Sequence, residues 1–310
     1  MKNIWVVSFI CRRGGNTGRK KCSRSWNRFT LPSRFERRAH RGQVRTFTLA
    51  NVLCLAAGLC GIPQLAPAQF GRNAPKDDKP APFKRTPDGK PDLNGLWQAD
   101  TLAPFDVEDH EAVYGIPAGK GVVVDPPDHK IPYQAWAVAK KNELFKDASN
   151  DPQAHCHLPG VPRAVYTPFP WEVVQKPGLV VFLYEYPHAI RIIHTDGSHK
   201  HPEGRDVLNT WMGDSVGHWE GDTLVVDVNG LNDQTWLDMA ANFHSDQLHV
   251  VERYTMINPK TIDYEATLDD PKVYTKPWTM KFKIRAQQAG ADIMEFECNE
   301  GERDLQHYVK

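Results

Sequence analysis

From Asp151 onward, apolar and polar residues alternate with period two, and turn residues recur at short intervals. This pattern predicts antiparallel strands joined by tight turns. Three such turns are Lys176-Pro177-Gly178, Glu220-Gly221-Asp222 and Asn258-Pro259-Lys260. Because helices do not alternate with the strands, we predict an all-β, mainly antiparallel fold, a barrel or sandwich, and not a βαβ fold.

The expected elements follow from this pattern. One helix is expected over 133–145, where apolar residues lie among lysines. The expected strands are an opening one near 94–97, then 171–175, 179–186, 188–195, 215–219, 223–228, 247–257, 261–268, 273–286 and 293–298. Many carry polar residues beside aliphatic ones, as the inner face of a ligand-holding barrel would, although edge strands show the same mixture.

Alternation in strand 247–257 assigns its residues to two faces. His249 and Glu252 fall on opposite sides of the strand. If Glu252 points into the barrel, it needs a cationic or hydrogen-bonding partner, because an unpaired buried charge is costly. We expect Arg163 or Arg191 to be that partner.

The N-terminal region has the order of an export signal. Thirteen arginines and lysines precede an apolar run, 49–62, and Ala66-Pro67-Ala68 matches a signal-peptidase site. We therefore predict cleavage after Ala68 and a periplasmic or secreted mature chain. The apolar run lies before the predicted cleavage point and is shorter than the roughly 20 residues that cross a bilayer. We therefore expect no transmembrane segment in the mature chain.

The expected organisation is a leader and signal peptide over 1–68, a disordered linker over 69–92 and a β-barrel domain over 93–310. The linker is rich in Pro, Lys and Asp and poor in large apolar residues. The basic leader is long for a signal peptide, so we interpret residues 1–43 as an upstream extension from a mis-assigned start, with Val44 as the true one. A lipid anchor at Cys60 is an alternative that the preceding Leu59 disfavours.

Only two cysteines, Cys156 and Cys298, lie after the predicted cleavage point. In an exported chain they predict a disulfide, with two separate buried thiols as the alternative. Lysine plus arginine equals aspartate plus glutamate, 38 each, and the cations are scattered among acids, which argues against nucleic acid as a partner.

Four segments carry a resemblance to a known family. They are 211–227 (WMGDSVGHWEGDTLVVD), 232–238 (NDQTWLD), 244–253 (HSDQLHVVER) and 269–278 (DDPKVYTKPW). They are similar to motifs of a family of exported, largely uncharacterised bacterial proteins often met in soil bacteria, and the likeness runs from about Arg85 to Glu302. The resemblance implies a lipocalin-like β-barrel outside the cytoplasm and no established reaction.

The densest group of reactive side chains lies between Trp211 and Arg253. Carboxylates and imidazoles beside aromatic rings suit proton transfer on a sugar or phenolic ring. The catalytic candidates are His244, Asp214, Asp233 and Asp246, with Asp238 as a further carboxylate. The substrate-binding candidates are Trp211, Trp236, His194, His249, Glu252 and Arg163. Their structural alternatives are helix caps, turns and ion pairs.

No metal site or cofactor is expected. The pairs His155/His157 and His199/His201 have the spacing that puts two rings on one face of a strand, but the second pair lies in a polar turn and isolated pairs are frequent in loops. The sequence contains no phosphate-cradling glycine loop, dinucleotide fingerprint, HExxH or G-x-S-x-G motif.

Two hypotheses follow. The first is an extracytoplasmic barrel enzyme, a lyase, isomerase or hydrolase that uses acid–base chemistry on a small carbohydrate or aromatic compound, with His244 as general acid or base. The second is a non-catalytic barrel that holds an apolar small molecule. The first gains if His244 lies within hydrogen-bond reach of Asp214, Asp233 or Asp246 at a cavity. Nothing in the sequence indicates the oligomeric state.

Overall fold

The computed structural model describes residues 3–13, 20–30, 78–112, 118–204 and 208–298. The chain divides into two units, residues 1–68 and 69–310. In the first unit, β1 (Asn3–Arg13) and β2 (Lys20–Thr30) form an antiparallel hairpin that the sequence pattern did not predict. The predicted start, apolar run, Cys60 and cleavage point lie outside the described residues.

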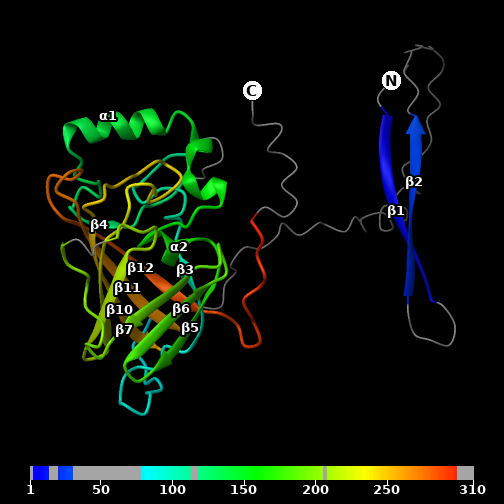
Figure 1. Ribbon diagram of the computed structural model, residues 1–310. Helices are drawn as coiled ribbons and strands as arrows, with labels where there is room; N and C mark the ends of the chain where they lie inside the picture. The colour runs from blue at the N-terminus through cyan, green and yellow to red at the C-terminus, as the bar shows by residue number, and fades with distance from the viewer. Residues whose placement is uncertain (1–2, 14–19, 31–77, 113–117, 205–207, 299–310) are drawn as a thin grey trace, which may run out of the picture. The chain divides into compact units, whose positions relative to one another are not determined.

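Nine strands of the second unit close into a barrel (Figure 1). Their order is β11-β10-β9-β8-β7-β6-β5-β3-β12, and pairing of β12 with β11 completes the ring. Short β4 (Val123–Asp125) adds to β12. The nine are β3 (Gly95–Asp100), β5 (Trp171–Lys176), β6 (Leu179–Tyr184), β7 (Ile190–His194), β8 (Asp214–Glu220), β9 (Thr223–Asn229), β10 (His249–Asn258), β11 (Thr261–Asp269) and β12 (Trp278–Ala286).

The all-β prediction is confirmed, and the three predicted turns join β5 to β6, β8 to β9 and β10 to β11. The sheet is mixed, however, because β7 and β8 are parallel and meet at a single pair, His194 and Val216. Close approach at this seam uses Gly217, where an added Cβ would lie 2.6 Å from the Ile193 side chain. Residues 293–298, expected as a strand, are not one, and the predicted strand 273–286 begins only at Trp278.

Large side chains fill the barrel interior. Burial alternates along β10 and β11, so one face of each strand points inward. The rings of Trp171, Phe182, Tyr254 and Tyr264 pack against one another or their neighbours and are almost fully buried. The inner face therefore packs as a core, in which Glu252 and Arg191 are buried polar residues.

The described part of the second unit contains two α-helices, α1 (Ala135–Leu144) and α2 (Arg163–Tyr166), with two 3-10 turns, η1 (Ala148–Asn150) and η2 (Pro152–His155). Helix α1, which the sequence predicts, lies beyond one end of the barrel (Figure 1). Among the described residues there is no helix of the length and apolarity that a membrane span requires.

The predicted disulfide between Cys156 and Cys298 is confirmed. It ties down the segment after β12, in which the backbone N–H of Phe296 donates to His188 and the ring of Phe296 packs on Phe169. These contacts use side chains of the barrel instead of a strand edge, which explains why 293–298 does not pair as a strand.

The described end of the predicted linker, 78–92, is hydrogen-bonded to the barrel. The backbone N–H of Ala81 donates to the carbonyl of Ile257, and Arg85 makes a bidentate ion pair with Asp222. Arg285 of β12 reaches Asp78 at 2.5 Å. The polar composition that suggested disorder thus supplies partners for polar groups at the strand ends.

Candidate functional site

A row of histidines and aspartates lies on the outer face of β8, β9 and β10. Residues that point outward from neighbouring strands come side by side, and Asp227 of β9 pairs in register with Val216 and Val251. His249 therefore lies diagonally next to Asp227. The row is continued by the loop between β7 and β8, which brings His199 and His201 to Asp214. We call this set of five residues the His–Asp row.

Hydrogen bonds connect the row from end to end. His199 contacts Asp214 at 2.7 Å, and His201 bridges Asp214 at 2.6 Å and Asp227 at 2.9 Å. His249 Nε2 lies 3.0 and 3.1 Å from the two carboxylate oxygens of Asp227. Each ring nitrogen of His201 therefore faces a carboxylate, so this ring joins the two aspartates.

His249 is the member of the row that faces a hollow. Its Nε2 is fixed by Asp227, whereas its Nδ1 has no hydrogen-bond partner among the described residues, and its side chain is 45% exposed. The hollow, which we call hollow A, has a volume of about 450 Å³. Its lining is mostly polar: Asn209, Asn229, Gly230, Asp246, Gln247, Leu248 and His249.

Asp246 lies at the edge of hollow A and is paired with Lys272 at 2.8 Å. The Lys272 hydrogen bond lowers the pKa of Asp246, so this carboxylate stays ionised and is not an acid that donates protons. It presents a fixed acceptor to a ligand.

His244, the predicted acid or base, is placed elsewhere. It is 2% exposed, accepts a hydrogen bond from the Thr235 hydroxyl at Nε2 (2.6 Å) and donates from Nδ1 to the Ser245 carbonyl (2.9 Å). Burial lowers its pKa, so the ring stays neutral. Neither Asp214, Asp233 nor Asp246 hydrogen-bonds to it among the described contacts, although the charge of Asp233 acts on it. With both nitrogens occupied, His244 supports the loop.

The remaining predicted substrate-binding residues fall into three places. Glu252 and Arg163 form buried ion pairs, with Arg191 and Asp151 respectively, and Trp236 is 6% exposed, so these side chains belong to the core. His194 flanks the His–Asp row, with its ring 5.5 Å from that of His199. Trp211 lies on a second hollow.

That second hollow, hollow B, has a volume of about 320 Å³. The rings of Trp211 and His157 stack there, 4.7 Å apart and nearly parallel at 6°. The other lining residues are Asn150, Pro152, His155 and Gln234. His155 Nε2 donates to the Ser149 carbonyl, whereas His157 stacks on Trp211, so the two histidines of this predicted pair do not converge on one point.

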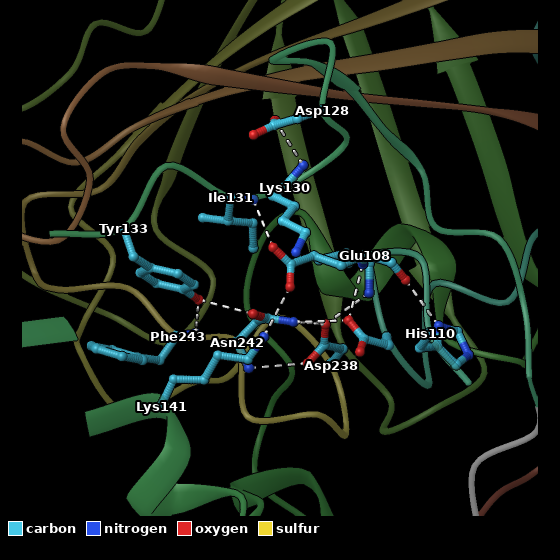
Figure 2. A network of polar contacts seen from close by, with 12 residues as sticks. Glu108, His110, Asp128, Lys130, Ile131, Tyr133, Lys141, Asp238, Asn242 and Phe243 are labelled. Atoms are coloured by element: carbon cyan, nitrogen blue, oxygen red, sulfur yellow. Dashed lines mark hydrogen bonds and ion pairs between the residues drawn. The ribbon is translucent and has the colours of Figure 1, made fainter. Parts of the chain in front are cut away.

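Asp238 and Asn242 lie in a separate buried polar network (Figure 2), which also includes the carboxylate of Asp106. The Asn242 side-chain amide donates to Asp106 and Asp238, at 3.1 and 2.6 Å, and the backbone N–H of Val107 donates to Asp238 at 2.9 Å. Burial and the neighbouring Asp106 raise the pKa of Asp238 to about 7. Because Asp238 is fully buried and both oxygens are occupied, the network joins two loops and does not face a ligand.

Among the residues that the structure describes, no group of three or more His, Cys, Asp or Glu side chains is arranged to hold a metal ion. In the His–Asp row the reason is visible, since the two nitrogens of His201 point to different carboxylates. Sequence analysis missed Asp227 and His201 as site residues. The signal was available, because alternation puts Asp227 and His249 on the outer faces of adjacent strands.

No family model, curated protein or solved structure matches the chain. The resemblance to exported bacterial proteins drawn from the four motifs therefore stays a prediction.

Proposed function

We propose that the protein is an acid–base enzyme that acts on a small carbohydrate in hollow A, outside the cytoplasm, with His249 as the proton-transferring group. The observation that carries the proposal is the Asp227–His249 pair at the edge of this hollow. A carboxylate on one imidazole nitrogen orients the ring and stabilises its protonated form, which leaves the other nitrogen to exchange a proton with a substrate.

The rest of the row supports this assignment. His201, hydrogen-bonded to both Asp214 and Asp227, holds the Asp227 carboxylate in place. Asp227 thus has a fixed orientation before a ligand binds. A lyase or isomerase requires a base that removes a proton from one atom of the substrate and returns it to another. A hydrolase would use the same group to activate water.

The lining of hollow A favours a carbohydrate over an aromatic compound. Side-chain amides of Asn209, Asn229 and Gln247 both donate and accept hydrogen bonds, and the ionised Asp246 accepts them, as sugar hydroxyls require. No aromatic ring other than the His249 imidazole lines it. The rival hypothesis, an apolar ligand inside the barrel, is less well supported because large side chains fill the interior that such a ligand would occupy.

The test is turnover of a panel of small carbohydrates by the purified protein and its variants. We expect His249→Asn and Asp227→Asn to lower kcat by about 100-fold or more, the usual contribution of a positioned acid or base. His218→Asn is the matched control, because His218 is an exposed histidine on β8 that pairs with a carboxylate, Glu220, outside the row. Wild-type turnover by His249→Asn on every active substrate would refute the proposal.

A further inference from the structure

Hollow B is a rigid feature that the proposed reaction does not use. The loop carrying His155 and His157 is fixed between them by the Cys156–Cys298 disulfide. The stacked Trp211 and His157 rings form an aromatic wall beside the exposed amide of Gln234. Aromatic faces next to amides are the surface that a sugar ring binds, with its C–H groups on the ring and its hydroxyls on the amide.

A backbone pairing links segments that line hollows A and B. Thr210 forms a parallel bridge with Leu231, its N–H donates to the Gly230 carbonyl at 2.8 Å, and its carbonyl accepts from the N–H of Asn232 at 2.8 Å. Asn209 lines hollow A and Trp211 lines hollow B.

Residues two apart on an extended segment point to the same side and lie roughly 7 Å apart. Asn209 and Trp211 flank the bridged residue Thr210, the position from which two side chains can reach the same side of the backbone. The facing segment also contributes to both hollows, with Gly230 in hollow A and Gln234 in hollow B. A ligand that leaves hollow A over this backbone pairing meets Trp211 next.

We propose that the two hollows form one binding groove for an oligosaccharide, with the reacting unit beside His249 and a remote unit on Trp211. This inference rests on the proposed function and names its substrate class more closely. Each hollow alone is near the lower end of the roughly 300 to 1,000 Å³ of ligand pockets. Together they suit a chain of several sugar units.

The experiment compares kcat/KM over a homologous oligosaccharide series, from dimer to hexamer, for the wild-type protein and Trp211→Ala. For the longer chains we expect Trp211→Ala to lower kcat/KM about tenfold, the equivalent of one lost stacking contact. The shortest substrates should change less than about twofold. Trp136→Ala is the matched control, because Trp136 is a 52% exposed tryptophan on α1 that lines neither hollow. An equal effect of Trp211→Ala on all lengths, or none, overturns the inference.

Two further measurements separate this inference from the proposed reaction. Calorimetric binding of the same series to His249→Asn should tighten with chain length, and Trp211→Ala in that background should abolish the gain. This outcome supports the groove even if His249→Asn turns over substrate normally, whereas length-independent binding contradicts it even if His249 is essential. Trp211→Phe, which keeps an aromatic face, should retain most of the chain-length effect. If Trp211→Phe loses this effect while its melting temperature is unchanged, the result counts against stacking.

Discussion

The ion pair at the centre of the barrel supplies a sharp test of how this fold is stabilised. Glu252 is fully buried and Arg191 is 3% exposed. Glu252 accepts hydrogen bonds from Arg191 and from the hydroxyls of Tyr254 and Tyr264, the latter two at 2.8 Å. Burial alone would lower the pKa of Arg191, but the charge of Glu252, the neighbouring Tyr254 and Tyr184 and the hydrogen bond to Glu252 together offset burial and raise this pKa. The substitution Arg191→Met keeps much of the side-chain volume and removes the charge.

Arg191→Met should lower the free energy of unfolding strongly, because the substitution leaves Glu252 as an uncompensated charge in the core. Removing one partner of a buried pair costs about 3–5 kcal/mol. That is a third or more of the roughly 5–15 kcal/mol that stabilises a typical domain. Arg191 also donates to Ser215 at 2.9 Å across the parallel seam between β7 and β8, so the substitution weakens that seam as well.

The assay is equilibrium unfolding in urea. We expect Arg191→Met to reduce the free energy of unfolding by about 3–5 kcal/mol. The double variant Arg191→Met/Glu252→Gln should recover about half of that loss, because it removes the unpaired charge and keeps an acceptor for the two tyrosine hydroxyls. Arg253→Met on β10 is the matched control, because its exposed ion pair with Glu220 of β8 is worth about 1 kcal/mol or less. A loss below about 1 kcal/mol for Arg191→Met, or no recovery in the double variant, would refute the reasoning.

Two further predictions concern loops at the barrel. The pKa of Asp238 is raised from 3.8 to about 7, so the stability it contributes is fully present below about pH 4 and is lost as the pH rises through 7. Asp106→Asn should therefore raise the free energy of unfolding at pH 8 by about 1 kcal/mol and leave it nearly unchanged at pH 4. Urea unfolding at the two pH values measures this difference, and equal effects at both would contradict the prediction. Cys156→Ser opens a covalent loop with a sequence separation of 142, worth about 5 kcal/mol in the chain-entropy model. Calorimetry should show a clearly lower melting temperature for Cys156→Ser, and reducing the disulfide of the wild-type protein should lower its melting temperature by a similar amount. An unchanged melting temperature would contradict the prediction.

The fold was predictable from sequence to the extent that it depends on local patterns. Alternation put Glu252 and His249 on opposite faces of their strand, and the need of an inward-pointing Glu252 for a partner selected two arginines, of which Arg191 is the partner. The choice between Arg191 and Arg163 could not be made, since it depends on which strand lies across the barrel. The parallel pairing of β7 and β8 was missed for the same reason, because alternation carries no information about the direction of a neighbouring strand.

The candidate site was predicted less well than the fold. Reactive residues near one another in sequence, such as His244 and Asp246, were grouped together, but folding buries His244 and leaves Asp246 exposed at hollow A. The His–Asp row instead joins residues far apart in sequence through cross-strand neighbours. Only the register of β9 against β10 brings Asp227 to His249, and register is a property of the assembled sheet.

The role of His249 can be measured directly by chemical rescue. Because its side chain is 45% exposed at hollow A, imidazole in solution can reach the space that His249→Ala leaves. We predict that this variant loses turnover of the carbohydrate substrate and that added imidazole restores part of it in a saturable manner, while His218→Ala needs no rescue. Full turnover by His249→Ala without imidazole would contradict proton transfer by the Asp227–His249 pair.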